Sequence, residues 1–377
     1  MTQSEKSSKP ARTGKRSRRQ PQVEFRSAEA KPIIFFTVGY QYYAERMLAT
    51  GLFQEGSLGR SMDGEGNPLP EDVPFADGER YLRLLTDVGD RCVVIVGGTV
   101  SDRETMDLLD LCHKMVEAGA GEIRLVLPFF GYSTMERAVK PGEAVKAKTR
   151  ALLISAVLKG VAKASVFMVD LHVEGLQHYF EYGIKTHHIY AKPVIIESVQ
   201  QLLINEYKRI KGLKRLTAAK KAEALAQPFV FASTDTGRVK WVDSLCRDMV
   251  KLNLKAEPAF IIKRRINGDK TEVQDISADV AGKLVIIYDD MVRTGGSLIK
   301  AARAYLKRGA AAVVAVLTHG VLPPGAKEKL ADSGVFQAVV VTDSHPRAVE
   351  LADSFLVVNS IAELLAQAVS KGRAELV

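Results

Sequence analysis

From residue 31 onward, short apolar runs alternate with stretches of helical periodicity, and this alternation constrains the fold more than any other feature. The runs are rich in Val, Ile and Phe and are apolar on both faces, which is typical of strands buried in a parallel sheet. They are PIIFFTV, CVVIVGG, IRLVLPF, SVFMVDLH, PFVFAST, AFIIKRR, LVIIYDD, AVVAVLTH and QAVVVTD. Helical stretches such as 102–119 and 297–309 lie between several runs and end at a glycine, as helices commonly do. The sequence therefore predicts an α/β architecture.

The strand-like runs are too many for one small sheet, so we expect two sheets in tandem, each in its own domain. A chain of 377 residues, 46% of them hydrophobic, has enough apolar material for two cores. Residues 194–227 form a long, basic, helical segment that we expect between the domains. We interpret it as a solvated linker helix, with a partner-binding surface as the alternative.

Positive charge is concentrated at the start of the chain. Lys and Arg dominate the first 20 residues, which contain Glu5 as their one acid and almost no apolar side chains. Such a segment cannot bury enough surface to fold, so the sequence predicts a disordered basic tail over residues 1–30. We expect a solubilising role for it, with nucleic-acid contact as the less favoured alternative. The net charge of +9 therefore does not by itself indicate a nucleic-acid-binding protein.

Cysteine usage and hydropathy bear on the compartment. Cys92, Cys112 and Cys246 lie in apolar or helical patterns without metal-type pairs, so we expect buried thiols in a reducing compartment. No apolar run is long enough to span a bilayer, and the N-terminus lacks the apolar core of a signal peptide. These features favour a cytoplasmic protein with no membrane partner.

One strand-like run, 284–288, ends in two carboxylates, Asp289 and Asp290, and a glycine-rich turn follows at 293–297. Ligands of open parallel sheets bind at the carboxyl ends of strands. Glycines let the backbone approach an anion closely, and the N–H groups at a helix start point toward it. Two adjacent carboxylates beside a phosphate suit a vicinal diol. The sequence therefore predicts a sugar-phosphate site, with ribose 5-phosphate as the simplest ligand.

This segment, VIIYDDMVRTGGSL, resembles the phosphoribosyl-pyrophosphate loop of type I phosphoribosyltransferases. Four further stretches, in family order, resemble motifs of the ribose-phosphate pyrophosphokinases, also called phosphoribosyl-pyrophosphate synthetases. They are FADGE at 75–79, MVDLHVEGLQHYF at 168–180, STDTG at 233–237 and IIKRRINGDKTEV at 261–273. The resemblance implies two tandem type I phosphoribosyltransferase-like domains, each with a mostly parallel sheet flanked by helices.

The domain limits that the resemblance implies follow the same order. Residues 31–190 would form the N-terminal domain, and residues 191–355 the C-terminal domain with the ribose-phosphate loop. Residues 356–377 would be a C-terminal segment that packs back on the N-terminal domain.

The resemblance also implies an activity. The family transfers the pyrophosphoryl group of Mg-ATP to the anomeric hydroxyl of ribose 5-phosphate, which gives phosphoribosyl pyrophosphate and AMP. It implies a homo-oligomer, because the ATP site would include residues of a neighbouring subunit. The cofactor would be Mg²⁺, which prefers oxygen ligands and keeps several waters, so a sparse protein ligand set is expected.

The roles that the resemblance implies can be assigned residue by residue. The ribose phosphate would be held by Asp289, Asp290, Thr294, Gly295, Gly296 and Ser297. The pyrophosphate loop would be Asp235, Thr236 and Gly237. ATP would contact Phe75, Asp77, Glu79 and Arg137, and Mg²⁺ would contact Asp170 and His172. Lys263 and Arg265 would be catalytic, because pyrophosphoryl transfer needs positive charge around a developing anion, and a closing loop supplies it.

Several positions depart from the family's pattern. Thr134, Met135 and Glu136 stand where Arg, Gln and Asp are usual in the ATP segment, and Arg293 replaces the usual third acid of the ribose-phosphate loop. The pyrophosphate loop lacks its second glycine and carries Arg238. The departures gather on the nucleotide side, whereas the ribose-phosphate side is mostly kept.

These departures leave alternatives beside a divergent ribose-phosphate pyrophosphokinase. One is the same chemistry on a larger ribose 5-phosphoryl compound such as ADP-ribose, for which Arg293 and Arg238 would serve the extra phosphates. Another is a non-catalytic regulatory homologue, although a subunit without activity has no need for the catalytic loop. A classical phosphoribosyltransferase would not need the nucleotide loop at 75–79.

Overall fold

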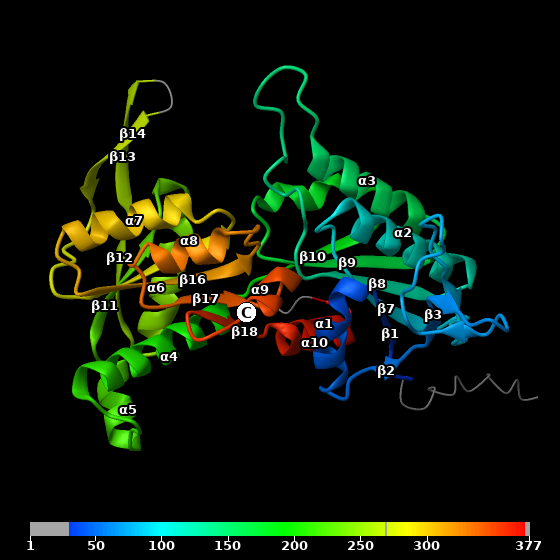
Figure 1. The fold of residues 1–377 in the computed structure, drawn as a ribbon, viewed down its shortest axis with the longest axis horizontal. Coiled ribbons are helices and arrows are strands. Elements are labelled where there is room, and N and C mark those ends of the chain that lie inside the picture. Colours follow the sequence, from blue (N-terminus) through cyan, green and yellow to red (C-terminus); the bar gives the residue numbers. More distant parts are fainter. Residues whose placement is uncertain (1–29, 268–269, 374–377) are drawn as a thin grey trace, which may run out of the picture. The chain divides into compact units, whose positions relative to one another are not determined.

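The structure is a computed structural model that describes residues 30–267 and 270–373, with the side chains of residues 263–274 excluded. Two six-stranded sheets form the frame, and every strand pairing within them is parallel. This arrangement confirms the predicted pair of parallel sheets flanked by helices (Figure 1).

The first sheet has the strand order β10-β9-β8-β7-β1-β2. Its strands are β1 (Ile33–Phe36), β2 (Gln54–Glu55), β7 (Cys92–Val96), β8 (Glu122–Leu127), β9 (Lys163–Val169) and β10 (Lys185–Ile189). Helices α2 (Asp102–Glu117) and α3 (Lys146–Leu158) cover one face, where their apolar sides pack on the alternate residues of β7, β8 and β9. The Ser101 hydroxyl accepts a hydrogen bond from the Glu104 N–H and so caps α2.

The second sheet has the order β12-β11-β15-β16-β17-β18. Its strands are β11 (Pro228–Ser233), β12 (Lys255–Ala259), β15 (Leu284–Val292), β16 (Ala312–Gly320), β17 (Val339–Thr342) and β18 (Leu356–Asn359). Helices α7 (Gly296–Lys307) and α8 (Ala326–Asp332) pack on one face, and α6 (Val239–Lys251) packs on the other. A short helix, α9 (Pro346–Glu350), follows β17.

A shared core joins the two sheets. It combines side chains from the first sheet, such as Phe167, with side chains from the second, such as Phe231. Helices α1 (Gln41–Leu48), α4 (Lys192–Lys211) and α10 (Ala362–Lys371) fill the space between them (Figure 1). The guanidinium of Arg124 on β8 donates hydrogen bonds to the carbonyls of Val369 and Ser370 in α10. Helix α10 therefore contacts the first sheet.

The segment between β2 and β7 folds into small antiparallel pairs. They are β3 (Leu58–Gly59) with β6 (Arg83–Leu84), and β4 (Ser61–Met62) with β5 (Pro68–Leu69). Single 3-10 turns lie at Val38–Tyr40, Glu174–Tyr179 and Thr236–Arg238. Among the described residues, no helix has both the length and the hydropathy needed to cross a bilayer.

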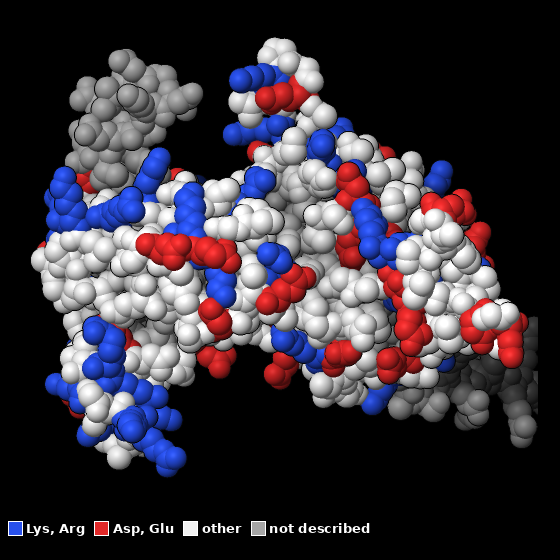
Figure 2. Space-filling model, viewed as in Figure 1, with Lys and Arg blue, Asp and Glu red and all other residues white. Residues whose placement is uncertain are grey.

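Two predicted segments differ from the structure. The run AFIIKRR is not a strand of the parallel sheet: β13 (Ile261–Asn267) pairs antiparallel with β14 (Lys270–Ile276) in a separate hairpin. The basic segment 194–227 is not one helix, because α4 ends at Gly212, whose φ of 63° is left-handed, and α5 (Ala218–Leu225) follows. Lys and Arg gather over the end of α4 and over α5 (Figure 2). Cys112 and Cys246 are buried, as expected, and Cys92 is half-buried.

Candidate active site

A cleft of about 460 Å³ lies at the carboxyl ends of β11 and β15. Parallel pairing brings these two strand ends together, so segments 55 residues apart in the sequence meet here. The first domain contributes as well, through Thr134 and His172. The cleft is lined by Thr134, His172, Thr234, Asp235, Gly237, Arg238, Asp289–Leu298 and Leu317.

The glycine-rich turn connects β15 to α7 and forms one wall of the cleft. Gly295 has a φ of 72°, and a Cβ at this position would lie 2.7 Å from the side chain of Leu330, so both conformation and space require glycine. Helix α7 begins at Gly296, and its first three residues, whose N–H groups have no partner within the helix, line the cleft. This is the geometry of an anion site at a helix start.

A basic residue that the sequence did not indicate lies beside this turn. A Cβ at Gly296 would lie 3.7 Å from the ammonium of Lys329, which comes from α8. Its positive charge favours an anion at the turn. The pattern of α8 alone gives no reason to select Lys329, because an exposed lysine on a helix is ordinary.

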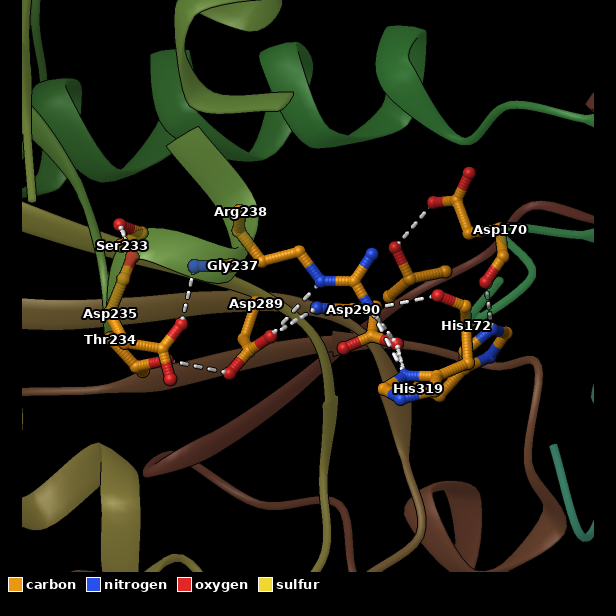
Figure 3. Close-up of polar contacts among 11 residues, drawn as sticks. Asp170, His172, Ser233, Thr234, Asp235, Gly237, Arg238, Asp289, Asp290 and His319 are labelled. Atoms are coloured by element: carbon orange, nitrogen blue, oxygen red, sulfur yellow. Dashed lines mark hydrogen bonds and ion pairs between the residues drawn. The ribbon is translucent and has the colours of Figure 1, made fainter. Parts of the chain in front are cut away.

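The two acids at the end of β15 have separate partners (Figure 3). The Asp289 carboxylate accepts a hydrogen bond from the Thr234 hydroxyl at 3.0 Å and one from the Asp290 N–H at 2.9 Å. The Asp290 carboxylate lies 2.6 Å from Nδ1 of His172. Asp290 is only 4% exposed, so its charge needs compensation by its neighbours.

Arg238 supplies that compensation. Its guanidinium pairs with the Asp290 carboxylate, and its Nε lies 3.7 Å from Oδ1 of Asp289. The same guanidinium lies 3.1 Å from Nδ1 of His172, so the imidazole and Arg238 flank one carboxylate oxygen of Asp290. Figure 3 shows the Arg238 side chain extending across both aspartates toward His172.

These contacts move the pKa values of the two acids in opposite directions. Burial, with the adjacent charge of Asp290, raises the pKa of Asp289. Burial alone would raise the pKa of Asp290 too, but the hydrogen bond with His172 and the charge of Arg238 lower it well below its usual value. The pair thus shares its negative charge unequally, with most of it on Asp290.

The comparisons with known proteins agree with this geometry. Residues 71–157 match the N-terminal domain of ribose phosphate pyrophosphokinase, and residues 253–374 match the phosphoribosyl synthetase-associated domain. A ribose-phosphate pyrophosphokinase of Prochlorococcus marinus is 32% identical over 297 residues, which are 78% of this chain and 80% of that protein. The chain belongs to the ribose-phosphate pyrophosphokinase family.

Two further relatives support the assignment. The ribose-phosphate pyrophosphokinase of Brucella melitensis is 30% identical over 80% of this chain and 87% of its own length. The phosphoribosylpyrophosphate synthetase of Mycobacterium smegmatis has the same fold, with a TM-score of 0.71, 22% identity, and coverage of 91% of this chain and 100% of that one. As a member of the ribose-phosphate pyrophosphokinase family, the protein is an enzyme.

All six ribose-phosphate residues expected for a pyrophosphokinase lie together. The cleft is lined by Asp289, Asp290, Thr294, Gly295, Gly296 and Ser297. Asp235 and Gly237 of the pyrophosphate loop join them, whereas Thr236 is exposed outside the lining. Asp235 accepts a hydrogen bond from the Gly237 N–H at 2.8 Å, which fixes this turn.

Asp170, which the resemblance assigned to Mg²⁺, does not line the cleft. Its carboxylate is buried and accepts hydrogen bonds from the Ala191 N–H at 3.1 Å and the Thr318 hydroxyl at 2.5 Å. Burial raises its pKa to about 6. These contacts suit a polar link between the two sheets better than a ligand position.

The expected nucleotide residues lie apart from the cleft. Phe75, Asp77 and Glu79 are exposed on the first domain, in a turn where the Phe75 N–H donates to the Glu79 carbonyl. Arg137 is exposed beside Glu136. Lys263 and Arg265 belong to β13, but their side chains lie outside the described residues.

The donor set at the cleft does not fit a resident divalent cation as it stands. Mg²⁺ prefers carboxylate oxygens and water, and the carboxylates here already surround the guanidinium of Arg238. Within residues 30–267 and 270–373, no group of three or more His, Cys, Asp or Glu side chains is arranged to hold a metal ion.

Proposed function

We propose that this protein is a ribose-phosphate diphosphokinase, which transfers the pyrophosphoryl group of ATP to the anomeric hydroxyl of ribose 5-phosphate. The reaction forms phosphoribosyl pyrophosphate and releases AMP. The observation that carries the proposal is the pairing, at one strand end, of an anion-binding turn with two carboxylates. A phosphate at the turn and a diol at the carboxylates together describe a pentose 5-phosphate.

Each end of this acceptor has its own partners. The 5-phosphate would accept hydrogen bonds from the first N–H groups of α7 and from the hydroxyls of Thr294 and Ser297, with Lys329 adding charge. The ribose hydroxyls would donate to Asp289 and Asp290. The anomeric carbon would then face the loop of Asp235 and Gly237, which lines the same cleft and where the transferred pyrophosphoryl group would lie.

The transfer step depends on the positioning of the two substrates and on positive charge around the transferred group, and it needs no covalent intermediate with the protein. The anomeric hydroxyl releases its proton to water as its oxygen bonds to the β-phosphorus of ATP, the bond from that phosphorus to the α,β-bridging oxygen breaks, and AMP leaves with the bridging oxygen. Lys263 and Arg265 on the β13–β14 hairpin would stabilise the charge that develops on the transferred group. We place Mg²⁺ with the substrate, as the counter-ion of the ATP phosphates.

The ATP-binding residues of the first domain favour a homo-oligomer in this proposal. Phe75, Asp77 and Glu79 are exposed and do not line the cleft of their own chain. A second copy of the chain would bring them to an ATP bound at the neighbouring site. Analytical ultracentrifugation at enzyme-assay concentrations tests this, and a monomer that retains full turnover would contradict it.

One observation favours a second acceptor. Arg293 is exposed at the rim of the cleft, beside the turn that would hold the 5-phosphate. A guanidinium there suits an acceptor that continues past that phosphate, as ADP-ribose does.

The experiment incubates the full chain with Mg-ATP and either ribose 5-phosphate or ADP-ribose, and follows AMP release. AMP formed with ribose 5-phosphate supports the proposal, and AMP formed with ADP-ribose alone supports the second acceptor. Arg293→Ala separates the two, because it should weaken use of ADP-ribose and leave ribose 5-phosphate unaffected. No AMP with either acceptor would contradict the proposed activity.

A further inference from the structure

Arg238 lines the cleft, yet its side chain is mostly buried and is held by several polar contacts. Its side chain is 13% exposed and those of Asp290 and Asp289 are 6% and 22% exposed. The guanidinium meets both carboxylates and also donates toward the His172 carbonyl at 3.4 Å. These contacts come from both domains, so they hold the side chain at one place.

The two carboxylates that contact Arg238 are of the ligand type that a hard divalent cation prefers. They lie in a water-accessible cleft, and Mg²⁺ or Mn²⁺ binds carboxylate oxygens while retaining several waters. A guanidinium among them is a permanent positive charge, because arginine is not deprotonated in proteins. A metal ion would have to displace it or bear its repulsion at close range.

The local sequence permits this arrangement. Position 238 follows Gly237 and is the N-cap of α6, with a φ of −110°, so an ordinary side chain is accommodated without strain. The side chain then extends across the ends of β11 and β15 to the aspartate pair (Figure 3). A glycine at this position would leave the carboxylates without their cation.

We propose that Arg238 is the resident cation of the Asp289–Asp290 pair and takes the place of a protein-bound divalent metal ion. The protein without nucleotide then has no divalent-cation site at the pair, and the acceptor diol must displace the guanidinium to reach the carboxylates. The statement about the acceptor diol rests on the proposed function. The test measures metal binding in the absence of substrates, so a failure of this inference can be distinguished from a failure of the proposed activity.

The test titrates Mn²⁺ into the full chain without nucleotide and follows the electron paramagnetic resonance signal of free Mn²⁺. The wild-type protein and Asp290→Asn should show the same background binding. Arg238→Gln and Arg238→Gly should each gain one site, at least about tenfold tighter than the background, because a positive charge has been removed from four neighbouring donor atoms. Adding Asp290→Asn to Arg238→Gln should abolish the gained site.

Arg238→Lys is the matched control, because it keeps the charge and should keep the background binding of the wild type. Thermal melting establishes whether each variant is folded. Two substitutions, Arg238→Gln and Arg238→Gly, are used so that the test can still be made if one of them does not fold. Two results would overturn the inference. One is a stoichiometric Mn²⁺ site in the wild type that Asp290→Asn removes. The other is folded Arg238→Gln or Arg238→Gly without tighter binding than Arg238→Lys.

Discussion

At the scale of single residues, two buried carboxylates differ in what compensates their charge. Asp290 faces His172 and Arg238, which lower its pKa against the effect of burial. Asp170 has hydroxyl and amide donors but no cation within hydrogen-bond distance among the described side chains, and burial raises its pKa to about 6. Its φ of 34° is one that residues other than glycine seldom adopt, so the surrounding contacts fix its backbone. Asp290 therefore carries its charge in the cleft, whereas the contacts of Asp170 lie at the junction of the sheets.

This difference leads to a prediction for Asp170. Asp170→Asn should keep turnover within about threefold, because an amide can still accept from Ala191 and pair with Thr318. Asp170→Ala should lower the free energy of unfolding by about 1–3 kcal/mol, since it leaves buried donors unsatisfied. Urea denaturation and AMP release measure the two effects. Loss of turnover in a stable Asp170→Asn protein would instead indicate a metal ligand.

At the scale of elements, the β15–turn–α7 unit and the β13–β14 hairpin have different tasks. The first is rigid by construction: the left-handed backbone of Gly295 and the side chain of Leu330 determine where α7 begins. The second stands outside both parallel sheets and carries the basic residues of the proposed transfer step. The acceptor would therefore bind to a fixed surface, while catalytic charge comes from a separate element.

A pair of glycine substitutions tests the first unit. Gly295→Ala should reduce the free energy of unfolding by about 1–2 kcal/mol, because it forces a β-carbon into the left-handed region and into Leu330. Gly296→Ala is the matched control for stability, since its Cβ would have no neighbour closer than 3.7 Å. We expect Gly296→Ala to fold normally. Equal losses of stability in the two variants would show that the backbone conformation of Gly295 is not the cause.

The hairpin gives a prediction about rate rather than stability. Lys263→Ala should reduce AMP release by about 100-fold or more, as loss of a preorganised charge does, and leave ribose 5-phosphate affinity nearly unchanged. Arg264→Ala removes the same charge from the same hairpin and should have a much smaller effect. Steady-state kinetics with calorimetric binding measure this. Wild-type turnover in Lys263→Ala would exclude the proposed role.

At the scale of the whole molecule, the cleft depends on the contact between the two sheets. His172 comes from the first domain and Asp290 from the second, and the shared core around α4 holds them together. One buried histidine, His319, and two half-buried ones, His188 and His345, lie along the same junction. Burial lowers the pKa of His188, His319 and His345 to about 4, and the His319 ring lies 3.3 Å from the Asp170 carbonyl of the other sheet.

These histidines predict how stability depends on pH. Each pKa is lower in the folded protein than the usual value of about 6.5. The contribution of each neutral histidine to the free energy of unfolding is therefore complete above pH 6.5. It is lost as the pH falls toward 4, because the unfolded chain takes up protons that the folded protein does not. His319→Gln should reduce the slope of the unfolding free energy by about 1.4 kcal/mol per pH unit in this window.

Urea denaturation between pH 7 and pH 4.5 measures this slope. His113→Gln is the matched control, because the His113 side chain is 59% exposed on α2 and its loss should leave the slope unchanged. An identical slope in the wild type and His319→Gln would contradict the assigned role of His319.

The sequence predicted local features because they depend on neighbours along the chain. The apolar runs indicated parallel strands, and the spacing of acids, glycines and hydroxyls at 289–297 indicated a sugar-phosphate loop, since one strand end and one turn contain all of it. The same reasoning misplaced AFIIKRR, because an apolar run does not reveal which strand it pairs with.

Tertiary structure decided how the charges combine. Asp170 and His172 are two residues apart in the sequence, yet the first turns toward Thr318 and the second toward Asp290, because each meets a different strand of the second sheet. The sequence indicated Arg238 as a replaced glycine and as a possible partner of extra phosphates, but its pairing with Asp289 and Asp290 follows from the parallel register of β11 and β15. Charge compensation depends on distances of a few ångströms between segments that are far apart along the chain.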